Sequence, residues 1–123
     1  MRRIDYDGII STWAGLNAEF MEPYGCAISP LDNALFVVDR SGNQVFTVDP
    51  FTANVSSLAG TGYAGASGDD GHATAAELNA PTSVAVSADG SIVFIADTDN
   101  SVIRAVALDN NTIYLVAVSD GRV

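Results

Sequence analysis

Residues 23–48 read PYGCAISPLDNALFVVDRSGNQVFTV, and residues 81–106 read PTSVAVSADGSIVFIADTDNSVIRAV. They align without a gap at a separation of 58 residues, and the alignment continues for twelve more residues in each copy. Seven aligned positions are identical, among them Asp39 and Asp97, and several apolar positions match as well. The chain therefore contains an internal repeat.

Each copy of the repeat predicts four β-strands. Short runs rich in Val, Ile, Phe and Thr alternate with turns rich in Asp, Asn and Gly, which is the pattern of strands joined by tight turns. The expected strands are residues 25–29, 34–39, 44–49 and 54–59 in the first copy and 83–87, 92–97, 102–107 and 112–117 in the second. Residues 73–78 have room for one helical turn at most.

A partial third copy precedes the first full one. Residues 10–15 (ISTWAG) match residues 55–60 (VSSLAG) at a separation of 45 residues. A repeated four-stranded antiparallel unit of about 45 residues is typical of β-propeller blades. We therefore predict an all-β chain, a partial β-propeller of about two four-stranded antiparallel blades plus a leading strand.

The predicted organisation is a single propeller fragment. Residues 1–15 are expected to form the outer strand of a preceding blade, 23–60 a blade, 61–80 a glycine-rich inter-blade loop and 81–118 a second blade. Cys26, in the innermost strand, is expected to be a buried structural thiol. Leu78 is expected to anchor the loop, and Arg104 to be a solvated charge at the rim.

The charge balance argues against nucleic acid as a partner and leaves RNA binding as the weakest alternative, and the hydropathy argues against a membrane. With 15 acidic and 5 basic residues the net charge is −10, which opposes binding to the phosphate backbone of nucleic acids. No run of about 18 apolar residues is present, so a transmembrane helix is excluded. We therefore expect neither nucleic acid nor membrane as a partner.

Residues 60–86 (GTGYAGASGDDGHATAAELNAPTSVAV) and 95–106 (IADTDNSVIRAV) resemble the NHL repeat, in the form with a glycine-rich insert known from bacterial and plant proteins and teneurin-like domains. Two residues depart from that pattern, since His72 stands where it usually has proline and Asp70 where it usually has glycine. The resemblance implies a propeller, commonly six-bladed, that binds proteins, RNA or small ligands. A minority of such relatives are lyases with a channel metal held by several histidines, whereas this chain has one histidine.

The links between blades and the turns after the second strands are expected to lie at one end of the blades, because successive strands alternate in direction. This places an acidic set at that end: Glu19, Glu22, Asp39, Arg40, Asp69, Asp70, His72, Glu77, Asp97 and Asp99. Asp39 and Asp97 are expected to cap their own turns. The candidate binding residues are Tyr24, Arg40, Tyr63, Asp69, Asp70, His72 and Asp99.

An exposed aromatic patch could be formed by Trp13, Phe20, Tyr24 and Tyr63. Trp13 is expected instead to pack in a strand, because its position matches Leu58 in the repeat. The acidic glycine-rich loop at 65–72 is expected to be structural, and a Ca²⁺ site made of its carboxylate and backbone oxygens is the alternative. We expect no other cofactor or metal.

No catalytic constellation stands out, so the sequence favours a non-enzymatic module that binds a protein or peptide on the loop face. The alternative is a blade pair of a metal-dependent propeller enzyme of lyase or hydrolase type. Two blades leave apolar faces open, so we expect either further blades from a longer chain or assembly of several copies. The isolated chain is expected not to be a stable monomer.

Overall fold

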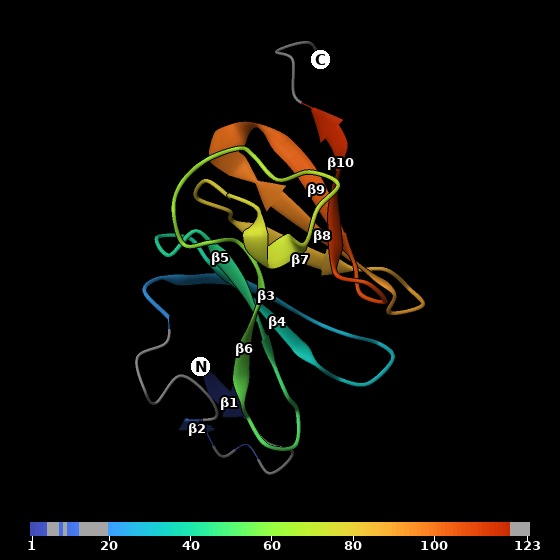
Figure 1. The fold of residues 1–123 in the computed structure, drawn as a ribbon. Helices are drawn as coiled ribbons and strands as arrows, with labels where there is room; N and C mark the ends of the chain where they lie inside the picture. The colour runs from blue at the N-terminus through green and yellow to red at the C-terminus, as the bar shows by residue number, and fades with distance from the viewer. Residues whose placement is uncertain (5–7, 9, 13–19, 119–123) are drawn as a thin grey trace.

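The computed structural model describes residues 1–4, 8, 10–12 and 20–118 as three antiparallel sheets (Figure 1). The first blade has the strand order β3 (Pro23–Ile28), β4 (Leu35–Asp39), β5 (Gln44–Val48) and β6 (Val55–Ala59). The second blade has the order β7 (Ser83–Val86), β8 (Ile92–Asp97), β9 (Val102–Ala107) and β10 (Thr112–Val118). The small third sheet pairs β1 (Arg2–Ile4) with β2 (Ile10–Thr12).

The predicted fold class is confirmed, and all eight blade strands begin and end within two residues of their expected bounds. The expected helical turn is the 3₁₀ helix η1 (Ala73–Ala75), and a second one, η2 (Thr98–Asn100), replaces a plain turn. Strand β1 was not predicted, because its sequence Arg-Arg-Ile has no apolar alternation. That β1 and β2 belong to a preceding blade stays a prediction.

The turns repeat with the strands. Asn43 and Ser101, which are equivalent in the two copies, both have left-handed backbone, with φ of 54° and 57°. Ala53 and Asn111 form a second equivalent pair, with φ of 61° and 55°. Side chains other than glycine seldom adopt this conformation, so its recurrence shows that the two blades share backbone geometry as well as sequence.

The main core lies between the two blades and is completed by the loop that joins them. Side chains alternate between the two faces of each strand, and one face of each blade is turned towards the other blade. The core consists of Phe36, Val38, Val45, Leu58 and Ala59 from the first blade, Val84, Val93, Ile95, Val106 and Ile113 from the second, and Ala73, Ala76 and Leu78 from the loop.

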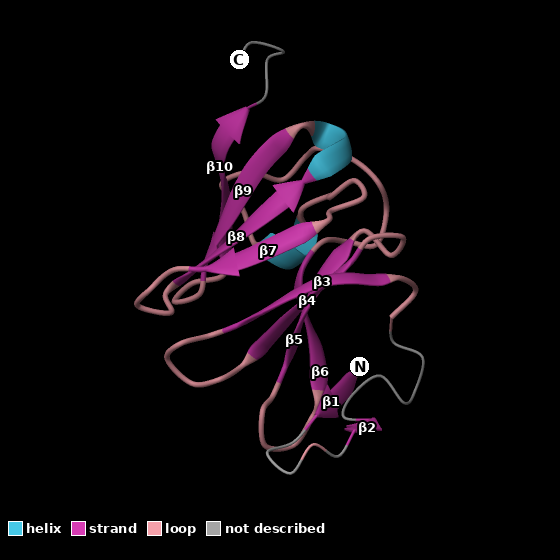
Figure 2. Ribbon diagram, turned by 180° about the vertical axis from the view of Figure 1, so that it is seen from behind, coloured by secondary structure: helices cyan, strands magenta, loops and turns pink. Residues whose placement is uncertain are grey.

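The two innermost strands, β3 and β7, lie side by side (Figure 2). A Cβ atom on Gly25 would come within 2.8 Å of the Thr82 carbonyl oxygen, so only glycine permits this approach of the two backbones. At the outer side, Leu78 is fully buried, which confirms its expected role as the anchor of the loop.

The two blades differ in how their faces are covered. Strand β4 is buried at all five positions, because Leu35, Val37 and Val48 form a second cluster with Met1, Phe20 and Val55 on the far side of the first blade. Strand β8 is buried only at alternate positions. We call the uncovered side of the second blade, which carries Phe94, Ala96, Ile103 and Ala117, the open face.

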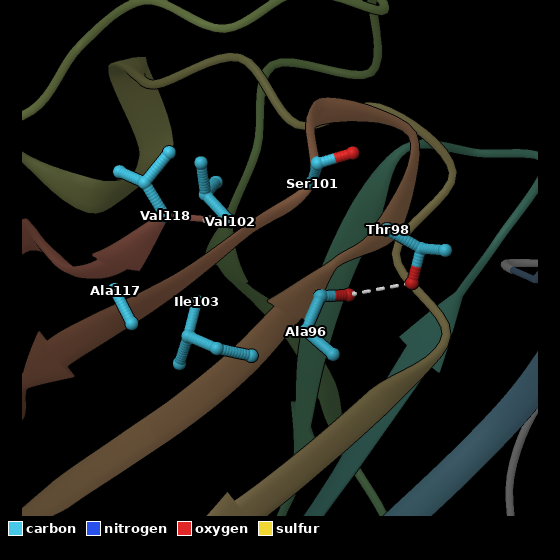
Figure 3. A pocket seen from close by; sticks show the side chains of 7 residues that line it. All are labelled: Ala96, Thr98, Ser101, Val102, Ile103, Ala117 and Val118. Carbon is cyan, nitrogen blue, oxygen red and sulfur yellow. Dashed lines mark hydrogen bonds between the residues drawn. The ribbon is translucent and has the colours of Figure 1, made fainter. Parts of the chain in front are cut away.

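A hollow of about 380 Å³ lies on the open face. Figure 3 shows its lining residues, with Ile103 and Ala117 on one side of the strands and Val102 and Val118 on the other, and the hydrogen bond from the Thr98 hydroxyl to the Ala96 carbonyl. Its wall is mostly aliphatic, as expected of a surface that another sheet covers in a larger assembly.

Candidate functional site

The structure divides the predicted site residues into three groups. Tyr24 and Arg40 lie together at the end of the first blade where β3 begins and β4 ends. Asp69 forms an ion pair with the buried Arg104, and Asp70 and His72 lie along the outermost strand of the second blade. Tyr63 and Asp99 are exposed and contact none of these groups through a hydrogen bond or ion pair of the described residues.

The first group, which we call the Arg40 cluster, consists of Glu22, Tyr24, Arg40 and Ser41. The Arg40 guanidinium lies over the Tyr24 ring, 5.1 Å from its centroid, in cation–π geometry. The Glu22 carboxylate lies 3.6 Å from the guanidinium and also accepts a short hydrogen bond from the Ser41 hydroxyl. Tyr24 is 56% exposed, so the cluster offers an aromatic edge and a guanidinium to solvent.

Asp39 holds the backbone beneath the Arg40 cluster. Its buried carboxylate accepts hydrogen bonds from the backbone N–H groups of Met21 at 2.9 Å, Glu22 at 2.8 Å and Gly42 at 3.2 Å. The bond to Gly42 confirms the expected turn cap, and the other two tie the preceding link to the same carboxylate. The Arg40 N–H donates to the Glu22 carbonyl. This bond joins the segment before β3 to the turn after β4, so both backbone segments of the cluster are held in place.

The second group centres on Arg104, which is 1% exposed, so the prediction of a solvated rim charge was wrong. Its guanidinium contacts Asp69 at 2.9 Å and Asp97 at 3.5 Å, and it donates to the Glu77 and Ser67 carbonyls at 2.6 and 3.0 Å. The reason is that the glycine-rich loop folds over this part of β9 and brings its carbonyl groups with it.

Asp97 therefore has a different role from the expected turn cap. It accepts a hydrogen bond from the Asn79 N–H at 2.7 Å and another from the Asn100 side chain at 2.8 Å, and no backbone N–H of its own turn. Asp97 is fully buried, and Arg104 supplies its counter-charge. Asp69 and Asp97 are thus structural partners of one guanidinium.

Asp70 and His72 lie beside the start of β10, at the opposite end of the sheet from Asp97. The Asp70 N–H donates to the Ile113 carbonyl at 2.7 Å, and His72 forms an antiparallel bridge with Thr112. The prediction that all the acidic loop residues share one end was therefore wrong for these two. The loop leaves the end of the first blade and runs along the outer strand of the second. Glu19 and Trp13 lie outside the described residues.

At both departures from the NHL pattern the backbone has the conformation that suits the usual residue. Asp70, where glycine is usual, has a left-handed φ of 69°, and His72, where proline is usual, has a φ of −66°, the value that proline prefers. The His72 ring compensates for a missing proline by accepting the Thr74 N–H, which caps η1. The His72 side chain thus has a local structural role, whereas Asp70 takes part through its backbone, whose N–H donates to the Ile113 carbonyl.

Two further predictions need correction. Cys26 is exposed, because the face of β3 that carries it points away from the second blade. Phe20 does not join an exposed aromatic patch, since its ring packs edge-on against Phe46 with centroids 5.4 Å apart. Tyr24 and Tyr63 are exposed, and Tyr63 reaches 78%.

The described residues contain no group of three His, Cys, Asp or Glu side chains that could hold a metal ion. A Ca²⁺ site in the loop would need Asp69 as a ligand, but the Oδ1 atom of Asp69 is already paired with the Arg104 Nε atom. In the same part of the chain, no helix is long and apolar enough to cross a membrane.

Comparison with known proteins agrees with the internal repeat. NHL repeat-containing protein 2 of Bos taurus is 32% identical over 118 residues, which cover 93% of this chain. Teneurin-m of Drosophila melanogaster is 34% identical over 113 residues, covering 81% of the chain. The chain is a module of NHL-type propeller blades. It spans only 15% of the first relative and 4% of the second, and no family model matches it.

Solved structures show the same fold for this NHL module. Virginiamycin B lyase from Staphylococcus aureus superimposes with a TM-score of 0.68 at 14% identity, over 97% of this chain and 34% of the lyase. A protein from Bacteroides thetaiotaomicron superimposes with a TM-score of 0.71 at 16% identity. The match covers 94% of this chain and 30% of the Bacteroides protein. At this identity the likeness concerns the fold alone. Two blades make up one third of a six-bladed ring, which agrees with the 34% of the lyase that this chain covers.

Proposed function

We propose that this NHL module is a non-enzymatic binding module and that the Arg40 cluster is its contact site for a protein or peptide. The observation that supports this proposal best is the exposed stack of Arg40 on Tyr24, held by the buried carboxylate of Asp39. Arg and Tyr are enriched among the residues that dominate binding energy at protein interfaces. A preformed pair also loses little conformational entropy on binding.

The chemistry of the cluster favours a peptide that presents oxygen acceptors. A guanidinium donates two parallel hydrogen bonds to a carboxylate or to neighbouring carbonyl groups. Within the described residues the Arg40 guanidinium has one ionic partner, Glu22 at 3.6 Å, so donors stay available. The Tyr24 ring adds an apolar contact beside them, which suits the backbone of an extended peptide.

The test is selection of peptides from a random displayed library on the whole chain, followed by affinity measurement for variants. Arg40→Ala and Tyr24→Ala should each weaken the selected peptides about tenfold or more, the loss expected of a dominant interface residue. Phe51→Ser is the control, because Phe51 is 92% exposed in the β5–β6 turn at the opposite end of the blade. Peptides that bind all three variants as tightly as the parent would contradict the proposal.

A further inference from the structure

The repeat positions of Tyr24 and Arg40 are filled differently in the second blade. Thr82 is equivalent to Tyr24 and Thr98 is equivalent to Arg40. The hydroxyl groups of the two threonines share a hydrogen bond of 2.6 Å, so this end of the second blade has a neutral pair whose polar groups satisfy each other. The fold that both blades share therefore does not require a cation or an aromatic ring at this place, and the pair in the first blade needs a separate explanation.

The donors of the Arg40 guanidinium are not used inside the molecule. Its contact with Glu22 is 3.6 Å long, and in the part of the chain that the structure describes this guanidinium donates no hydrogen bond. A charge-assisted hydrogen bond between nitrogen and a carboxylate measures about 2.7–2.9 Å. The buried Arg104, in contrast, donates to the Asp69 carboxylate at 2.9 Å and to two loop carbonyl groups. Arg104 is thus a satisfied arginine, whereas Arg40 keeps its donors for another acceptor.

The Glu22 carboxylate is held beside this guanidinium by Ser41. The Ser41 hydroxyl donates a short hydrogen bond to the Oε2 atom of Glu22, and the Oε1 atom is the one that lies near the Arg40 Nη1 atom. The Glu22 and Arg40 side chains are 40% and 42% exposed, so a ligand can reach both. An exposed ion pair contributes little to stability. Glu22 therefore occupies the place of a carboxylate in front of the cation without engaging its donors.

We propose that the Arg40 cluster binds a carboxylate group of its peptide and that Glu22 is an internal carboxylate which this group displaces. This role rests on the proposed function, since it names the part of the peptide that the cluster recognises. A carboxylate that accepts two parallel hydrogen bonds from a guanidinium makes a stronger contact than the present one at 3.6 Å. Ser41 remains a hydrogen-bond partner for Glu22 after the displacement. A neutral carbonyl group is disfavoured, because it competes with the charge of Glu22 without a charge of its own.

The carboxylate comes either from the C-terminus of the peptide or from an Asp or Glu side chain, and three acetylated pentapeptides distinguish these sources. The first alternates Ala and Gly and has a free C-terminus. The second has Asp at its centre and an amidated C-terminus, and the third is the amidated Ala–Gly peptide without Asp. Each is titrated into the whole chain while the Arg40 Nε–H resonance is followed by NMR. At least one carboxylate peptide should shift this resonance and saturate at millimolar concentration, and the neutral peptide should leave it unchanged.

The Glu22→Gln variant tests the displacement. The amide keeps an acceptor for the Ser41 hydroxyl and removes the competing charge, so the carboxylate peptide should bind about threefold more tightly, as expected for loss of an exposed ion pair. Asp109→Asn is the matched control. It makes the same change of charge at an exposed residue of the β9–β10 turn, at the opposite end of the blades, and should leave the affinity unchanged.

Three outcomes would overturn this proposal. One is an unchanged Arg40 resonance with both carboxylate peptides, and another is an equal shift with the neutral peptide. The third is an equal gain in affinity for Glu22→Gln and Asp109→Asn, because the effect then comes from net charge alone. Library peptides that lose affinity in Arg40→Ala would still support a peptide contact at the cluster in all three cases. Failure of the carboxylate preference is therefore distinguished from failure of the proposed function.

Discussion

Each blade is preceded by a link, and each link contacts its blade at the same repeat position. The contact is aromatic in the first blade and polar in the second. Phe46 of β5 and Arg104 of β9 are separated by 58 residues and occupy the same place in their blades. In the first blade the ring of Phe20, from the link, meets Phe46 at an interplanar angle of 79°. In the second blade the link forms hydrogen bonds with Arg104.

One part of the fastening is common to both blades. Asp39 accepts the Met21 N–H and Asp97 accepts the Asn79 N–H, and each of these pairs is equivalent to the other in the repeat. The carboxylate at the end of the second strand therefore fixes the start of the blade in both copies. This shared bond explains why both aspartates are among the identical positions of the alignment.

The difference follows from what each link brings to the blade. The residues of the glycine-rich loop, 61–80, lay the Ser67 and Glu77 carbonyl groups over β9. Buried carbonyl groups need donors, and an aromatic ring has none to offer, whereas a guanidinium has five. The side chain at this repeat position thus follows the polarity of the segment that covers it.

Arg104→Met should destabilise the protein more than any other substitution considered below. The substitution leaves the fully buried Asp97 without its counter-charge and two loop carbonyl groups without donors. We expect the free energy of unfolding to fall by about 3–5 kcal/mol, the usual cost of removing one partner of a buried ion pair. Urea unfolding followed by circular dichroism measures the loss.

Arg40→Met, at a half-buried arginine, is the control for the change of side chain, and it should stay within about 1 kcal/mol of the parent. Equal losses for the two arginines would show that burial of Arg104 contributes nothing. A stable Arg104→Met variant would show that an apolar side chain can replace the guanidinium under the loop.

Val45 and Ile103 test how the covered face and the open face differ in stability. They are equivalent in the repeat, but Val45 is fully buried between the blades and Ile103 is 37% exposed. Val45→Ala should cost about 2 kcal/mol of unfolding free energy, and Ile103→Ala about 1 kcal/mol or less, although it removes more atoms. Thermal unfolding of both variants tests the order. The reverse order would mean that the open face is covered in solution.

Asp70→Gly should raise stability by about 0.5 kcal/mol, because Asp70 has a left-handed backbone that glycine adopts at no steric cost. Asp99→Gly makes the same chemical change in η2, where no positive φ is present, and should lower stability instead. Chemical denaturation resolves the sign of both changes. A loss in both variants would show that the Asp70 side chain contributes more than its backbone costs.

The strands were predictable from sequence because two aligned copies show the same alternation and the same turn residues. Burial was harder to predict, since it depends on neighbours that each blade has or lacks. Cys26 illustrates this point: an inner strand is normally covered on both sides, but the side that carries Cys26 is exposed.

The Arg40 cluster was partly predictable, because Tyr24 and Arg40 both stood out near the expected end of the blade. The buried network was missed, although the repeat alignment holds a signal for it. Arg104 aligns with the apolar Phe46, and a position that is apolar in one copy points inward in both. Nothing in the sequence shows that the loop then runs along β10, since that path depends on long-range bonds such as Asp70 to Ile113.

The smallest predicted effect concerns the turns between the first two strands of the blades, where Ser29 and Ser87 are equivalent. Ser29 accepts the Leu31 N–H, whereas Ser87 donates to Asp89. Hydrogen bonds from the Ser91 and Ser87 hydroxyls lower the pKa of Asp89 from 3.8 to about 2. Because this pKa is lower in the folded state, the stabilisation is complete above the unfolded pKa and is lost as pH falls towards 2.

An NMR titration of the Asp89 carboxyl carbon tests this, with Ser91→Ala expected to raise the pKa and the remote Ser56→Ala expected to leave it near 2. Asp89 is fully exposed, so the variant should hardly change overall stability at neutral pH. An unchanged pKa in Ser91→Ala would mean that the hydroxyl does not hold the carboxylate in solution. Ser29 and Ser87, the equivalent serines, would then have different neighbours in sequence but the same effect on electrostatics.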